Sequence, residues 1–219
     1  MGRSHGTLLA RPTKSSTPKQ SEQYYTGTGI VLLMATRDDL WEVAVDQYGY
    51  VTTADAARMG VPVVEVVKLA SRGGLTRVSQ GVYRFPQWPV GANDHLMEAV
   101  LWTRDPTAVL SHDTALDVLD LCDINPTLLH VTVSGRKYPI RRRETLAGLM
   151  IHYEQLDSTQ RGWWEQIPTV TAQTAIEQGI ATSVRPDLLN QAIDTAARRA
   201  MIDPVIADQL RDTLEKKYQ

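Results

Sequence analysis

The chain has little cysteine and no long apolar run. One cysteine, Cys122, in 219 residues cannot form an internal disulfide and excludes a metal site built from several cysteines. The longest apolar run near the N-terminus, residues 30–35, is too short for a secretory signal or a membrane span. With 42% apolar and 22% charged residues, the chain has the composition of an ordinary globular protein, and we expect it in the cytoplasm.

Sequence motifs of catalysis are missing as well. The chain has no glycine-rich phosphate loop, no G-x-S-x-G nucleophile elbow and no HExxH motif. The tetrapeptide Ser111-His112-Asp113-Thr114 contains a His-Asp pair, but it is first of all typical of a capped helix start. Three further histidines are scattered without the spacing of metal ligands: His95, His130 and His152. The sequence therefore predicts no catalytic residue, no metal site, no cofactor and no enzymatic activity.

Charge is unevenly distributed along the chain. The formal net charge is -2, but residues 1–90 hold 10 Lys and Arg against 7 Asp and Glu, whereas residues 91–219 hold 13 against 18. The two parts thus carry +3 and -5. Because neither is strongly basic, any contact with DNA must come from local patches rather than from a global field.

Residues 1–35 are rich in Ser, Thr, Gly, Lys and Pro and show no sustained periodicity. Such a segment buries too little apolar area to offset its ordering entropy, so we expect a disordered tail. Thr36 to Asp39 fits a capping box and predicts a first helix over 37–48. Since Met34 stands just before this helix start, one hypothesis is that the native protein begins there.

The segment from Gly49 to Phe85 has the order of a winged helix-turn-helix. A second capping box at 52–55 opens a short helix, Gly60 supplies a turn, and Pro62 begins a third helix over about 62–72. Two short β-rich stretches, 75–78 and 82–85, then flank a Ser-Gln-Gly turn as a hairpin. We therefore predict a DNA-binding winged helix over residues 36–90.

In such a module the third helix enters the major groove of DNA. Its pattern predicts a buried face with Val63, Val66, Val67 and Ala70, and Val64 is available for a thymine methyl group. The predicted DNA contacts of the third helix and the wing are Lys68, Arg72, Arg77, Gln80 and Arg84. Winged helices also serve as protein-interaction modules, and a valine-rich third helix also suits a core role, so both alternatives stay open.

The second region, residues 91–219, mixes strands and helices and ends in helices at about 171–178, 186–200 and 204–217. The complete fold is therefore expected to be α+β, a winged helix followed by a mixed domain. Five cations within eight residues follow its best strand, 128–134: Arg136, Lys137, Arg141, Arg142 and Arg143. This run is either a solvated loop or a second set of DNA phosphate contacts, and in the latter case its substitution weakens binding to all sequences alike.

The residues of both regions resemble AbiEi-type antitoxins. The resemblance rests on the stretch Gly49 to Ala57, on Gly60-Val61, on Gly74-Leu75 and on Gly81 to Arg84, which together match the winged helix of that family. In the second region, Val109 to Leu116 is similar to the family's "SHxTAL" element, and a strand at 131–133 follows it. The resemblance covers about residues 36–155 and weakens beyond them.

This resemblance implies an antitoxin of a type IV toxin–antitoxin system that represses its own operon. Its partners would be double-stranded operator DNA with inverted repeats, bound as a dimer, and a nucleotidyltransferase-like toxin that it counters through residues 91–219 without a stable complex. Two alternatives remain: a plain winged-helix transcriptional regulator, and an interaction module that binds the toxin directly. Some relatives join a Vsr-like endonuclease domain, but this chain lacks the acidic cluster with a following lysine that metal-dependent cleavage needs.

Overall fold

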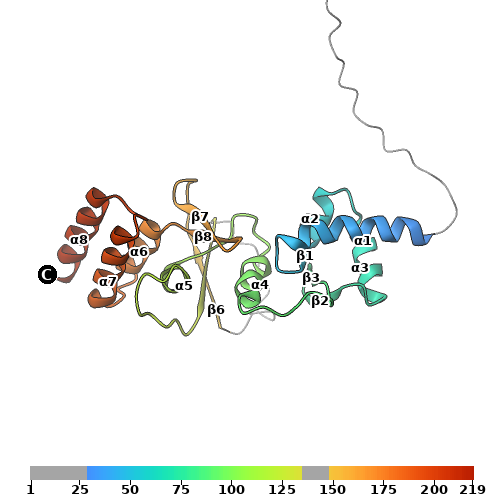
Figure 1. Cartoon of the computed structure of the whole chain (residues 1–219), viewed down its shortest axis with the longest axis horizontal. Helices are drawn as coiled ribbons and strands as arrows, with labels where there is room; N and C mark the ends of the chain where they lie inside the picture. The colour runs from blue at the N-terminus through green and yellow to red at the C-terminus, as the bar shows by residue number, and fades with distance from the viewer. Residues whose placement is uncertain (1–28, 135–147) are drawn as a thin grey trace, which may run out of the picture.

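The computed structural model describes residues 29–134 and 148–219. In these ranges the chain forms two sheets with helices around them, and Figure 1 shows an elongated arrangement with the N-terminal helices at one end and α6 to α8 at the other. No helix in the described ranges is long and apolar enough to cross a membrane. The predicted α+β class, with a winged helix first and a helical end, is confirmed.

The first domain begins with α1 (Gly29–Val45), which is followed by β1 (Tyr50–Thr52), α2 (Thr53–Arg58) and α3 (Val63–Ser71). The predicted capping box is present: the Thr52 side chain accepts from the Asp55 backbone N–H, and the Asp55 carboxylate accepts from the Thr52 backbone N–H. The turn between α2 and α3 passes through Gly60, whose φ is +74°. The helix-turn-helix therefore forms as the sequence predicted.

Two features at the start of this domain differ from expectation. α1 begins at Gly29 rather than near residue 37, so the helix includes residues 29–35 of the expected tail; residues 1–28 lie outside the described part. The helix also ends at Val45, and the following residues turn into β1, a strand that the sequence analysis missed. Three residues are too few for a period-two pattern to be recognised.

The wing is a hairpin of β2 (Thr76–Ser79) and β3 (Val82–Arg84), and β1 joins it to make a three-stranded sheet in the order β1-β3-β2. All pairs are antiparallel. Beneath the helices and this sheet lies one apolar core, whose fully or almost fully buried members include Leu40, Val51, Val66, Leu69, Leu75, Tyr83 and Phe85.

The buried face of α3 differs from the predicted one. Val66 and Leu69 are buried, whereas Val63, Val64 and Val67 have exposed fractions of 47%, 55% and 50%. The prediction that Val63 and Val67 face the core was therefore wrong. Apolarity alone assigned them to the core, but the helix packs through the row of Val66 and Leu69, and the other valines face away from it.

The second domain is built on a five-stranded mixed sheet in the order β6-β5-β4-β8-β7. Its strands are β4 (Val109–Leu110), β5 (Leu129–Val133), β6 (Leu149–Tyr153), β7 (Arg161–Trp164) and β8 (Ile167–Val170). β5 and β6 run parallel, as do β4 and β8, and the remaining neighbours are antiparallel. β7 was not predicted, because the sequence RGWW offers only four residues and no alternation.

Helices cover both faces of this sheet. α4 (Asp94–Trp102) packs on one face in an apolar cluster that also takes in Tyr50 and Val82 of the first domain. α5 (His112–Val118), α6 (Ala172–Ala181), α7 (Pro186–Arg198) and α8 (Pro204–Tyr218) share a second cluster with Val109 and Val170. Cys122 belongs to this second cluster, and burial raises the pKa of its thiol to about 11, so the thiol is protonated and unreactive at neutral pH.

Polar contacts join the two domains. The Arg84 guanidinium of β3 donates to the Asp94 carboxylate of α4 at 2.5 Å, and it also lies over the ring of Tyr50 at 5.3 Å. The Tyr48 hydroxyl of the first domain donates to the backbone carbonyl of Glu165 at 2.6 Å, and within the second domain the Asn93 amide donates to the Glu165 carboxylate at 2.7 Å. These contacts, with the shared apolar cluster, hold the winged helix against the α4 face of the second domain.

Gly49 is expected to be essential for the first domain. Its φ is +80°, and a Cβ there would overlap the Trp88 side chain, so Gly49→Ala combines backbone strain with overpacking and should lower the free energy of unfolding by about 2 to 5 kcal/mol. Gly73→Ala is the matched control, because Gly73 has φ +78° but open space around it, and its cost should be about 1 to 2 kcal/mol. Urea denaturation followed by tryptophan fluorescence measures both; equal losses would contradict the role of Trp88.

Candidate nucleic-acid interface and a histidine cluster

The exposed face of α3 carries two cations and a row of valines. Lys68 is half exposed and donates to Glu65 at 2.8 Å, one turn earlier on the helix. Arg72, at the end of the helix, is exposed and makes no ion pair within the described part of the chain. Val64 and Val67 are exposed on the same helix. The surface thus offers cations for phosphates and methyl groups for the edges of thymines.

The wing contributes two of its three predicted residues to the surface. Arg77 and Gln80 are exposed, with the Arg77 guanidinium donating to the carbonyl of Ser79 at 3.3 Å. Arg84 is different: only 16% of its side chain is exposed, and it is engaged by Asp94 and by the carbonyl of Pro89. The prediction that Arg84 meets DNA is therefore corrected to a structural role, since β3 is the central strand of its sheet and directs this side chain toward the second domain.

The other predicted set of DNA contacts cannot be placed. Arg136, Lys137, Arg141, Arg142 and Arg143 lie outside the described residues, in the connection between the parallel strands β5 and β6.

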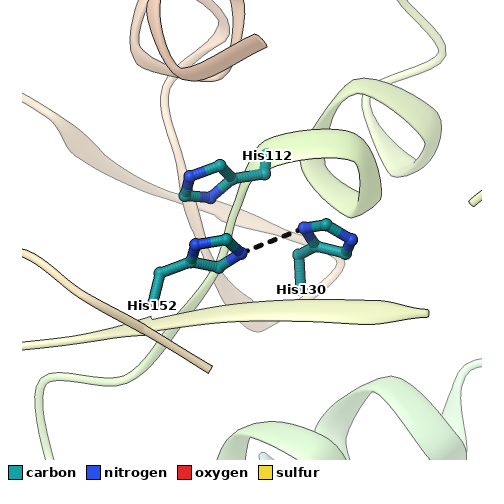
Figure 2. A group of neighbouring side chains, drawn as sticks. All are labelled: His112, His130 and His152. Atoms are coloured by element: carbon teal, nitrogen blue, oxygen red, sulfur yellow. Dashed lines mark hydrogen bonds between the residues drawn. The ribbon is translucent and has the colours of Figure 1, made fainter. Parts of the chain in front are cut away.

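Three histidines that are far apart in the sequence form a cluster in the second domain. His112 stands at the start of α5, directly after β4, while His130 and His152 lie on the neighbouring strands β5 and β6. One ligand nitrogen from each ring lies within 4.8 Å of the others. Figure 2 shows the His112 ring above the His152 ring, with His130 beside them and hydrogen-bonded to His152. His152 Nε2 lies 3.1 Å from His130 Nδ1. The rings of His112 and His152 are stacked, with centroids 3.5 Å apart.

Sequence spacing gave no signal for this cluster, because its members are separated by 18 and 22 residues and come from three elements. The sheet register makes the connection: Thr132 pairs with His152, so His130, two residues earlier on β5, is a diagonal neighbour on the same face. The interpretation of His112 as a structural helix start is incomplete, since the Ser111 side chain makes no capping bond to α5 and instead contacts the His112 ring.

Buried polar side chains form hydrogen bonds with the backbone and the ring of His112. The backbone N–H of His112 donates to Oε1 of the buried Gln178 at 3.1 Å, and the Gln178 amide donates to the Glu154 carboxylate at 2.9 Å. Ser111 Oγ lies 3.0 Å from His112 Nδ1 and accepts from the Thr132 hydroxyl at 2.8 Å. His112 itself has φ +51°, a left-handed conformation that a side chain other than glycine adopts at a cost.

The environment keeps these imidazoles neutral. Burial, together with the smaller effect of the two neighbouring histidines, lowers the pKa of His112 to about 3. Burial also lowers the pKa of His130 and His152, although the negative charge of Asp113 opposes the shift at both rings. Three neutral rings with lone pairs therefore lie side by side at neutral pH, which is the state in which imidazole binds metal ions.

Comparison with known proteins bears on the first domain. Residues 38–86 match a family model described as "Transcriptional regulator, AbiEi antitoxin". The N-terminal domain is thus similar to this family over residues 38–86. The predicted resemblance is thereby confirmed over the winged helix, and the match ends before α4.

No curated protein matches the chain. Among solved structures, the crystal structure of RV2827C protein from Mycobacterium tuberculosis is similar over 84% of this chain and 77% of that chain, with 15% sequence identity and a TM-score of 0.40.

Acid is expected to destabilise the protein through His112. The folded state depresses its pKa to about 3, whereas the unfolded chain takes up the proton near pH 6.5, so this contribution is complete above pH 6.5 and is lost as the pH falls toward 3. His112→Asn removes the group, and asparagine tolerates the positive φ. Between pH 6.5 and about pH 5, wild type should lose about 1 to 2 kcal/mol more unfolding free energy than this variant.

Urea denaturation across that pH range, with a chelator present, measures the difference. His95→Asn is the control, because His95 is exposed on α4 and outside the cluster. Its unfolding free energy should change with pH as that of wild type does. If the unfolding free energy of His112→Asn falls with pH as steeply as that of wild type, the lowered pKa of His112 is contradicted.

Proposed function

We propose that the protein is an antitoxin of a type IV toxin–antitoxin system that binds operator DNA and represses its own operon in the cytoplasm. The observation that carries this proposal is the AbiEi-type winged helix at residues 38–86, a family described as transcriptional regulators and antitoxins. The exposed α3 face adds physical support, since Lys68 and Arg72 are exposed while the buried row of the helix holds the domain together. The role is regulatory rather than enzymatic.

In this proposal α3 enters the major groove. Lys68 and Arg72 contact phosphates or base edges, and Val64 packs against a thymine methyl group. The wing follows the adjacent backbone with Arg77 and Gln80. Lys68 must exchange its bond to Glu65 for a phosphate, which costs little because an exposed ion pair contributes at most about 1 kcal/mol.

Few cations lie on α3, so affinity has to come from further contacts. The basic residues between β5 and β6 are the proposed second set: Arg136, Lys137, Arg141, Arg142 and Arg143. Two copies bound to an inverted repeat double every contact, and the protein is accordingly proposed to act as a dimer on DNA. An unchanged salt dependence after substitution of the basic residues would refute their part in binding.

The second domain is proposed to counter the toxin, a nucleotidyltransferase-like protein, without forming a stable complex. A plain transcriptional regulator and a direct toxin-binding module are the two alternatives. The plain regulator keeps the proposed DNA-facing surface and lacks the antitoxin role, whereas the interaction module binds the toxin protein itself.

DNA binding is tested by a mobility-shift assay on the region upstream of the gene. Arg72→Ala and Arg77→Ala should each weaken binding by about 1 kcal/mol, roughly fivefold, because each removes a cation from the proposed surface. The slope of log affinity against log salt should fall by about one for each phosphate interaction that the substitution removes.

Arg211→Ala is the matched control for charge. Arg211 lies on α8, at the other end of the molecule from α3, and its side chain pairs with Asp194 and Asp208. Its substitution should leave affinity and salt slope unchanged. Absence of any shift with wild type, or equal losses in Arg211→Ala and Arg72→Ala, would overturn the proposed interface.

Antitoxin activity is tested separately by co-expression with the product of the adjacent gene. Rescue of growth that persists in Arg72→Ala is the expected result, because the second domain and not α3 is proposed to act on the toxin. No rescue by wild type supports the plain regulator, and co-purification at fixed stoichiometry supports direct binding.

A further inference from the structure

We propose that His112, His130 and His152 form a binding site for one divalent transition metal ion of the zinc class, which joins the start of α5 to β5 and β6. This site is independent of the proposed DNA interface, since its ligands lie on the second domain, on the face of the sheet opposite α4. The donors are three imidazole nitrogens, the ligand set that suits Zn²⁺ and its neighbours rather than Mg²⁺ or Ca²⁺.

The distances between the nitrogens fit such an ion. With bonds of about 2.0–2.1 Å and tetrahedral angles, zinc places its ligand nitrogens about 3.3 Å from one another. His152 Nε2 and His130 Nδ1 are 3.1 Å apart, and all three ligand atoms lie within 4.8 Å. His130 and His152 are therefore already spaced as two ligands, and the ion would replace the hydrogen bond between them. A small tilt of the stacked His112 ring that keeps its contact with Ser111 would complete the set.

The surroundings of His112 select which nitrogen binds. A metal-ligating histidine normally donates its other ring N–H to a fixed oxygen, which sets its tautomer and orientation. Ser111 Oγ is that oxygen here: it is fully buried, lies 3.0 Å from Nδ1 and is itself fixed by the Thr132 hydroxyl. With Nδ1–H donating to Ser111, the lone pair of Nε2 is directed to the ion.

Charge and backbone geometry add independent support. Asp113 and Glu154 carry negative charge close enough to act on the His152 ring, and an adjacent dication balances that charge. The left-handed backbone of His112 is held by Gln178, which bonds both the His112 N–H and the Glu154 carboxylate. An ordinary helix start needs neither a strained backbone nor a buried amide that holds it. At His112 both occur, and its ring lies against two other histidines.

The fourth position of a tetrahedral ion would be taken by water or by an exogenous ligand. The described residues supply three His donors within reach, and the ion therefore has the ligand count of an open site rather than of a closed structural one. Because its ligands come from three elements that are distant in sequence, binding would stabilise the folded second domain over the unfolded chain.

The test uses the full chain, without an added histidine tag, after removal of metals by a chelator. Co²⁺ is the probe, because a four-coordinate Co²⁺ ion absorbs visible light strongly whereas Zn²⁺ has no visible absorption band. We expect saturable uptake of one Co²⁺ per chain. One equivalent of Zn²⁺ should displace the Co²⁺ and abolish its visible absorbance, and Zn²⁺ should raise the Tm of the protein. His130→Gln should lose the visible signal and the rise in Tm, whereas His95→Gln, which removes the exposed histidine of α4, should keep both.

Ser111→Ala is the second variant and removes no ligand. It should retain one site but weaken metal affinity 10- to 100-fold, as expected for loss of the oxygen that orients a ligating ring. If circular dichroism shows that His130→Gln does not fold, the metal affinity of Ser111→Ala tests the proposed site in its place. No saturable Co²⁺ uptake by wild type at micromolar concentration, uptake that is the same in folded His130→Gln, or unchanged affinity in Ser111→Ala would overturn the proposal.

Discussion

The ion pair between Arg84 and Asp94 is the contact on which the arrangement of the two domains depends. Both side chains are mostly buried, and Arg84 also lies over the Tyr50 ring, so the pair joins β3, the central strand of the three-stranded sheet, to α4, the first helix of the second domain. Removing one partner from a buried pair leaves an uncompensated charge and is strongly destabilising. Arg84 of the wing thus holds the winged helix in place, and the exposed Arg77 and Gln80 are the wing residues left for the proposed DNA interface.

Local patterns predicted the helices well and the faces less well. The capping box at Thr52 and the turn at Gly60 are encoded within a few residues, so they were predicted from the sequence and are present. The exposure of Val63 and Val67 depends on which row of α3 meets the core, and apolarity does not specify that. Arg84 was similarly assigned to the DNA surface because its partner, ten residues away on α4, has no signature in sequence.

The histidine cluster shows the same limit more strongly. His112, His130 and His152 are brought together by the register of β5 with β6 and by the short step from β4 into α5, and sequence spacing records neither. Only tertiary structure distinguishes these three residues from His95. The positive φ of His112 is likewise invisible in sequence, although it is the feature that separates this turn from an ordinary helix start.

The long shape of the molecule places α3 and α8 at opposite ends, with the five-stranded sheet between them (Figure 1). If α3 binds DNA as proposed, that DNA lies at the end of the molecule away from α6 to α8. The surface of these last helices would then stay accessible while the proposed DNA interface is occupied.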